Sequence, residues 1–281
     1  MTHANDAFAY ALFLFIWFRT RRDRSAWQYA LLGASAALCA LVRNQNAVFV
    51  LFPLVAIGLD SFRQAGQRGW ISAGLWGTLR AALFSLTWWV IFSPQLGVWR
   101  VVFGRWVPGN PYETSGGGSF DFLNPRLLDV LLSTNRGLWL WTPVALLGVL
   151  GWLILWRNQR RFAALLMTNF LLQLYIIASW SAWDGSAAFG QRFFTNMMPA
   201  FAIGLAALCA LLARRVAMRW LVFAGSLFVA WNGLLIVRYV LEDVPRSGPV
   251  PLDHFIIGQF TVIPRHFAQI LEILLTRGSG S

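Results

Sequence analysis

The sequence predicts an all-α protein, built as a polytopic bundle of transmembrane helices. Hydrophobic residues make up 58% of the 281-residue chain and charged residues only 12%, which is too little polar surface to cover a soluble domain of this size. Long apolar runs alternate with short arginine clusters, and the chain contains no lysine. Because these arginines directly flank apolar runs, we expect the net charge of +12 to face anionic membrane lipids, and we expect no nucleic-acid partner.

The apolar runs set the expected number of crossings. A helix needs about 20 residues, at ~1.5 Å per residue, to cross the apolar core of a bilayer. We expect about eight crossings in a transmembrane helical domain over residues 1–241, formed by the runs 7–18, 26–42, 46–59, 78–103, 138–156, 162–180, 193–213 and 217–241. Residues 242–281 are expected to form an outer C-terminal segment, with a candidate ninth helix at 255–275, either amphipathic or membrane-spanning.

The first run is short and begins among polar residues. His3, Asn5 and Asp6 can accompany a crossing only at the membrane surface or inside a protein cavity. A signal peptide carries its basic segment before the apolar run, whereas here the arginines follow it, so we do not expect one.

The arginine clusters predict which side each loop faces. The clusters at 19–24, 63–80, 157–161 and 214–219 fall on one side if successive runs cross the membrane in alternating directions; that side holds 13 arginines and two acids, and the other side holds ten arginines and nine acids. Cytoplasmic loops are enriched in basic residues. We therefore expect a bacterial inner-membrane protein whose functional face is periplasmic, with outer loops at 104–136 and 179–192.

The tryptophan-rich segment 179–192 is the clearest candidate site. It contains Trp180, Trp183, Asp184 and Arg192. One interpretation is an aromatic belt with a surface turn, because tryptophan favours the headgroup region. The other is a substrate site, since indole faces stack on sugar rings and a guanidinium suits phosphate oxygens.

Segment 104–136 contributes Tyr112 and Arg136. It is either a lid over a site or a simple connector. The glycines at 116–118 do not form a nucleotide phosphate loop, because no Gly-Lys-Ser/Thr follows them.

Two further groups of polar residues lie near helix ends. His3 and Asp6, at i and i+3, would share one helix face and so orient a hydroxyl or share a metal ion, or they are ordinary solvated residues at a chain end. Residues 43–46 either cap helix ends or let Arg43 add a second cation to an anion site.

Several kinds of site are missing from the sequence. It has no His-Glu-x-x-His, Gly-x-Ser-x-Gly or Walker motif, and Cys39 and Cys209 lie within apolar runs without metal-like spacing. Mid-helix positions are almost wholly apolar, which disfavours a transporter. We predict no protein metal site; the cofactor stays unknown, with a divalent cation as one option.

Segments 103–125, 131–143 and 180–192, together with 2–4 and 40–46, resemble the C-terminal half of bacterial GT-C membrane glycosyltransferases. These are similar to the dolichyl-phosphate-mannose protein mannosyltransferase and aminoarabinose transferase superfamily, including glycosyltransferase 39-like proteins. The resemblance covers nearly the whole chain through loose, mainly hydrophobic motifs.

The resemblance implies transfer of a sugar, with inversion, from a polyprenyl-phosphate donor to a lipid, glycan or protein acceptor. In this family the catalytic base is an Asp, or an Asp-Glu or Asp-Asp pair, in the first outer loop. This sequence has no such loop ahead of Asp6. We therefore expect the base and several helices upstream of Met1 or in a partner, and this chain alone to be inactive.

Roles for this chain's own residues follow from the same resemblance. The donor phosphate is expected to contact Arg192 with Arg136 or Arg43. Substrate binding is expected to involve Trp180, Trp183, Asp184, Tyr112, His3 and Asp6. The alternative is a non-catalytic membrane protein that binds or flips lipid-linked saccharides.

Overall fold

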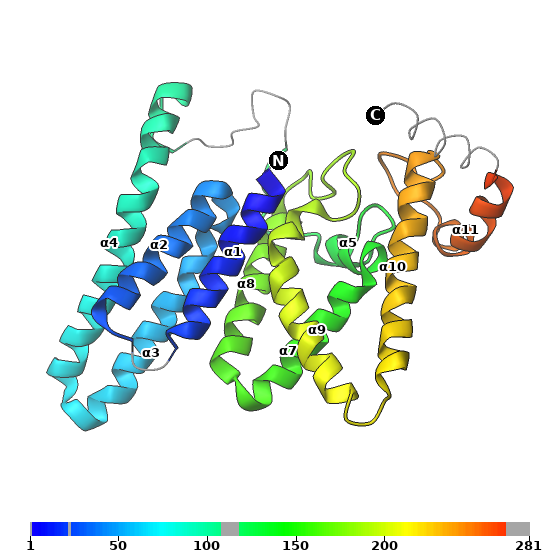
Figure 1. Ribbon diagram of the computed structural model, residues 1–281. Coiled ribbons are helices and arrows are strands. Elements are labelled where there is room, and N and C mark those ends of the chain that lie inside the picture. The colour runs from blue at the N-terminus through cyan, green and yellow to red at the C-terminus, as the bar shows by residue number, and fades with distance from the viewer. Residues whose placement is uncertain (1, 22–23, 108–117, 268–281) are drawn as a thin grey trace, which may run out of the picture.

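The computed structural model describes residues 2–21, 24–107 and 118–267, and over these residues the protein is helical without strands (Figure 1). Its elements are α1 (Thr2–Arg19), α2 (Ala26–Val42), η1 (Asn44–Val50), α3 (Leu51–Arg68), α4 (Trp70–Phe103), α5 (Leu127–Leu132), α6 (Leu138–Trp141), α7 (Pro143–Asn158), α8 (Arg160–Ser179), η3 (Arg192–Met197), α9 (Met198–Leu212), α10 (Met218–Val240) and α11 (Leu252–Arg265). The predicted all-α class is confirmed.

Five segments of the described chain are long and apolar enough to cross a membrane. They are Asn44–Gln67, Trp70–Phe103, Arg160–Ser179, Arg192–Leu212 and Met218–Val240. Helices α2 and α7 are apolar but shorter. These lengths indicate an integral membrane protein, and the larger number of about eight crossings stays a prediction.

The long elements run alternately up and down, so their connections gather at two ends (Figure 1). The α1–α2, α3–α4, α7–α8 and α9–α10 turns lie at one end, which we call the arginine-rich end. The N-terminal end of α1, η1 and η3 lie at the other end, which we call the polar end. This alternation is the one expected from the arginine clusters.

Helix α1 packs in the interior of the bundle. Tyr10 and Phe13 have no exposed surface, and the Tyr10 ring centroid lies 4.8 Å from that of Phe49. The helix packs against α2, η3 and α9. Of the polar residues in its first turns, Asp6 is enclosed by protein and His3 is partly buried, whereas Asn5 is exposed.

Helices α7 and α9 approach closely because glycines face each other. A Cβ atom added at Gly151 would lie 1.8 Å from the carbonyl oxygen of Gly204. Beside this contact, Trp152 Nε1 donates to the carbonyl of Ala200 at 2.9 Å. Small residues that let backbones approach are a common way of packing helices in membranes, where there is no hydrophobic drive between them.

Helix α11 is anchored to the end of α10 by a buried arginine. Arg238, which has no exposed surface, donates to Asp243 Oδ2 at 2.7 Å and to the carbonyls of Phe255 at 2.7 Å and His254 at 2.9 Å. The candidate helix at 255–275 is observed as Leu252–Arg265, beginning three residues earlier. Residues 268–275 of that prediction lie outside the described residues.

Replacing Gly151 by Val should destabilise the bundle, because the added side chain has no room against Gly204. We expect a loss of about 1–3 kcal/mol, as for other overpacked cores, measured as a lower unfolding midpoint in detergent. Gly225→Val is the matched control, since a Cβ there meets nothing within 4 Å. Equal midpoints for both variants would contradict the close α7–α9 contact.

Candidate functional site

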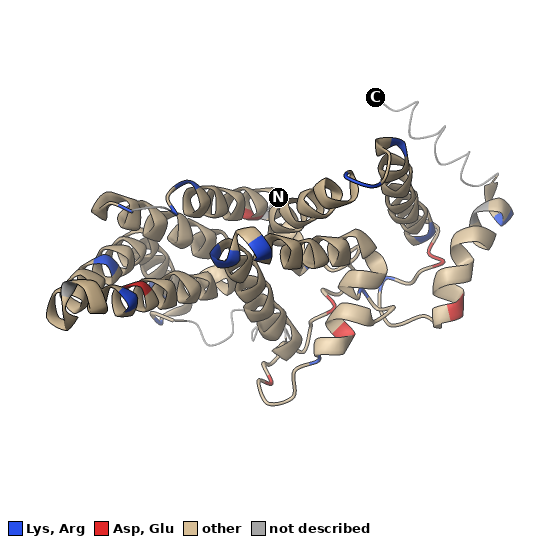
Figure 2. Cartoon of the chain, turned by 90° about the horizontal axis from the view of Figure 1, so that it is seen from below, with Lys and Arg blue, Asp and Glu red and all other residues tan. Residues whose placement is uncertain are grey.

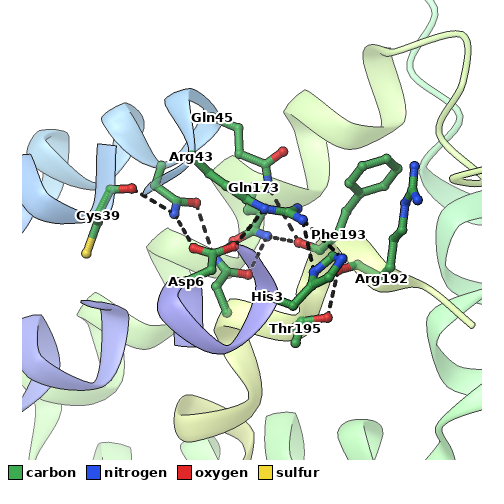
Figure 3. Close-up of polar contacts among 11 residues, drawn as sticks. His3, Asp6, Cys39, Arg43, Gln45, Gln173, Arg192, Phe193 and Thr195 are labelled. Atoms are coloured by element: carbon green, nitrogen blue, oxygen red, sulfur yellow. Dashed lines mark hydrogen bonds and ion pairs between the residues drawn. The ribbon is translucent and has the colours of Figure 1, made fainter. Parts of the chain in front are cut away.

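Polar side chains from four segments meet at the polar end of the bundle (Figure 3). We call this group the Asp6 cluster. Its members are His3 and Asp6 of α1, Arg43, Gln45 and Asn46 at the α2–η1 junction, Gln173 of α8, and Arg192 and Asn196 of η3.

Asp6 is the centre of the cluster and has no exposed surface. Its Oδ1 accepts a hydrogen bond from Asn46 Nδ2 at 2.6 Å, and its Oδ2 lies 3.1 Å from Arg43 Nε. The Arg43 contact is an ion pair without the direction of a good hydrogen bond, since Oδ2 has no hydrogen-bond partner. Burying a carboxylate costs free energy unless the group is paired. These two contacts explain how the Asp6 side chain can be buried between α1 and its neighbours.

An amide network extends the cluster to α8 and η3. Asn196 Nδ2 donates to Asn46 Oδ1 and to Gln173 Oε1, both at 3.0 Å. Gln173 Nε2 donates in return to Asn196 Oδ1 at 2.8 Å and to the Phe193 carbonyl. The network joins Asp6 to two elements far along the sequence.

Sequence reasoning missed the amides of α8. Asn169 and Gln173 are buried within a run described above as almost wholly apolar, and Asn169 Nδ2 donates to the Tyr10 hydroxyl at 3.1 Å. Their spacing of four residues was the available signal, because it places two amides on one helix face that must find partners away from lipid.

Arg43 connects the buried acid to His3. Its side chain is 17% exposed, and its Nη2 lies 2.9 Å from His3 Nδ1. A guanidinium only donates, so the accepting ring nitrogen carries no proton. Burial, followed by the charges of Arg43 and Arg192, lowers the pKa of His3 below its usual 6.5, which keeps the imidazole neutral at pH 7.

Arg192 lies on the other side of His3 and is exposed (Figure 3). Its guanidinium carbon stands 5.3 Å from the centroid of the Phe193 ring, and its side chain packs over Gly185, where a Cβ would lie 3.2 Å from Arg192 Nε. Among the described residues, no hydrogen bond or ion pair engages this guanidinium. Arg43 and Arg192 thus offer two cations on either side of a neutral imidazole.

Arg136, the third predicted phosphate ligand, is buried elsewhere. It donates to the carbonyl of Ala188 at 2.6 Å, to Asn135 Oδ1 at 2.6 Å and to the carbonyl of Pro245 at 3.2 Å. It has no exposed surface and a φ of 67°. These contacts favour a cross-link between loops, and Arg136 has no part in the site assembled here.

Asp184, the acid of segment 179–192, stabilises the turn in which it lies. Asp184 accepts from Asn135 Nδ2 and from the Ser186 backbone N–H, both at 3.1 Å. Neither of these contacts involves Arg192.

The aromatic residues of the same segment divide into two kinds. Trp183 is 6% exposed and accepts a hydrogen bond from Gln191 through its carbonyl. Trp180 is partly exposed, and its ring lies 5.1 Å from that of Phe193, next to Arg192. Tyr112 lies outside the described residues.

Over the ranges that the structure describes, no three His, Cys, Asp or Glu side chains gather closely enough to hold a metal ion. The Asp6 cluster itself offers hydrogen bonds and charge. Two guanidiniums against one buried carboxylate suit a ligand with negative charge.

Replacing Asp6 by Ala should destabilise the protein by about 3 kcal/mol, the lower end of the cost of removing one partner of a buried ion pair, because Arg43 keeps some contact with water. Denaturant unfolding in detergent measures this loss. The matched control is Asp129→Ala, an exposed acid of α5, expected within about 0.5 kcal/mol of the parent. An equally small effect at Asp6 would show that the cluster does not stabilise the fold.

Comparison of the chain with protein-family models, curated proteins and solved structures finds no match, so its function is inferred from the geometry of the Asp6 cluster.

Proposed function

We propose that this chain binds a polyprenyl-phosphate-linked sugar at its polar end and forms the donor-binding part of a membrane glycosyltransferase. The observation that carries the proposal is the position of Arg43 and Arg192 on either side of His3. Three residues distant in sequence, each a candidate from sequence alone, lie together at one end of a membrane-length helix bundle.

Arginine suits this donor because its planar donors match phosphate oxygens. A sugar-linked phosphodiester carries one negative charge, and the phosphate gains a second as the bond to the sugar breaks. Fixed cations stabilise that developing charge more than they stabilise the bound donor. Asp6 contributes indirectly, because its ion pair fixes Arg43 before the ligand arrives.

The surroundings suit the remaining parts of the donor. The partly exposed Trp180, which packs on the buried Phe193 beside Arg192, offers an indole face for a sugar or the first isoprenoid units. The polyprenyl chain would follow the apolar outer faces of the helices. By the basic-residue rule the polar end faces the periplasm of a bacterial inner membrane.

The acceptor hydroxyl needs a base, and Asp6 is poorly placed to serve as one. It is enclosed, and both of its oxygens face Asn46 or Arg43, so we assign it a positioning role. The proposal therefore leaves the role of the base to another residue of the enzyme or to a partner. The same burial favours a second candidate function, in which the chain binds or flips lipid-linked saccharide without transferring it.

Replacing Arg192 by Ala should weaken binding of a short-chain polyprenyl-phosphate sugar by roughly 10- to 100-fold, the effect of losing a hydrogen bond to a charged group. The measurement is a binding titration on the chain in lipid nanodiscs. Arg126→Ala is the matched control, because Arg126 is exposed and its backbone N–H bonds to Ala178 beside the same segment. Unchanged affinity in a folded Arg192→Ala variant would rule out the phosphate role.

A transfer assay on the product of the whole gene separates the two candidate functions. If Arg192→Ala lowers both binding and sugar transfer, the glycosyltransferase is supported. If the parent protein binds the donor with the same dependence on Arg192 but transfers no sugar to any acceptor class, the binding or flipping function is supported.

A further inference from the structure

A second cationic site lies at the arginine-rich end, away from the Asp6 cluster. A cavity of about 460 Å³ opens among the end of α1, Arg24, α3 and the α7–α8 turn. Its charged lining consists of Arg21, Arg24, Arg157, Arg160, Arg161 and Asp60. Figure 2 views the molecule from this end, and blue segments lie at several of the helix ends that face the viewer.

Asp60, the one acid among the described residues of this lining, is already paired. Both oxygens of Asp60 contact the guanidinium of Arg161, with Nη1 at 3.0 Å from Oδ2. Arg157 and Arg160 have no hydrogen bond or ion pair among the described residues, and both are exposed. Among the described residues, Arg157 and Arg160 therefore bring two positive charges to the cavity that have no protein partner.

Arg24 is fixed in the cavity wall. It donates to Thr20 Oγ1 and to the Trp17 carbonyl, both at 3.1 Å, and its guanidinium carbon lies 4.2 Å from the Trp17 ring centroid. Burial is the main cause that lowers the pKa of Arg24. Asp60 favours the charged form of this partly exposed guanidinium, and an anion in the cavity adds to that favourable charge and offsets more of the cost of burial.

We propose that this cavity binds a phosphate group. Its volume is that of a small-molecule site, and the first turn of α8, beginning at Arg160, adds backbone N–H groups suited to an anion. Trp17 and Phe162 supply an apolar wall for the glycerol and first acyl carbons of a phospholipid. The headgroup phosphate of an anionic lipid and a soluble phosphate share this chemistry. The site is independent of the function proposed for the polar end.

Lipid retention tests the site. The purified chain is equilibrated with phosphatidylglycerol or phosphatidylcholine, and bound lipid is counted by native mass spectrometry. We expect the parent to retain phosphatidylglycerol preferentially and the Arg157→Gln/Arg160→Gln variant to bind it about tenfold less tightly, the loss of one charge-assisted contact. Arg214→Gln/Arg215→Gln removes the same charge from the exposed α9–α10 turn at the same end, outside the cavity, and should retain the lipid.

Inorganic phosphate distinguishes the two sources. If phosphate raises the unfolding midpoint of the parent but not of Arg157→Gln/Arg160→Gln, the cavity takes soluble phosphate; if only phosphatidylglycerol is retained, it takes a lipid headgroup. Equal losses in the two double variants, or no preference for either ligand in the parent, would overturn the proposal. Should the glutamine variant fail to fold in phosphatidylcholine, Arg157→Lys/Arg160→Lys keeps the charge and removes the fork of donors, and undiminished binding there would equally contradict recognition by the guanidiniums.

Discussion

The ion pair between Asp6 and Arg43 is the interaction on which the polar end of the bundle depends. A carboxylate with no exposed surface in an apolar bundle needs a compensating charge and donors. Arg43 and Asn46 supply them at 3.1 and 2.6 Å. Because these partners come from the α2–η1 junction, the ion pair fixes α1 against that junction and leaves the outer part of Arg43 facing His3 and Arg192.

The two ends of the bundle use arginine differently. At the polar end Asp6 fixes Arg43 through an ion pair. The neutral His3 lies between Arg43 and Arg192. At the arginine-rich end Asp60 forms an ion pair with Arg161, and no other guanidinium of the cavity forms an ion pair within the part of the chain that the structure describes. The first arrangement is suited to holding a phosphate in one orientation, and the second to holding an anion by excess charge.

Sequence patterns predicted the helices well because hydrophobic length is a local property. Each of the eight apolar runs overlaps a helix, although the bounds differ: α3 extends to Arg68, beyond the predicted 59, and α4 begins at Trp70, ahead of the predicted 78. The side-chain partners were harder to predict, because they depend on how distant segments pack. Nothing local indicated that Gln173 and Asn196 would share hydrogen bonds.

Arg136 shows the same limit. Its type and its position in an outer loop suggested a phosphate ligand, but three protein acceptors from the loops around it already occupy its donors. Exposure of a guanidinium depends on tertiary structure, which composition and spacing do not contain. Arg43 and Arg192 retain that exposure in part or in full.

A double-mutant cycle tests most directly whether Asp6 acts through Arg43. The affinity for a short-chain polyprenyl phosphate is measured for the parent, Asp6→Asn, Arg43→Gln and the double variant, each checked for folding. We expect Asp6→Asn to weaken binding about tenfold when Arg43 is present, and to have little further effect when Arg43 is replaced. Independent, additive losses would contradict a positioning role for Asp6, and undiminished binding in all three variants would contradict a phosphate site at the Asp6 cluster.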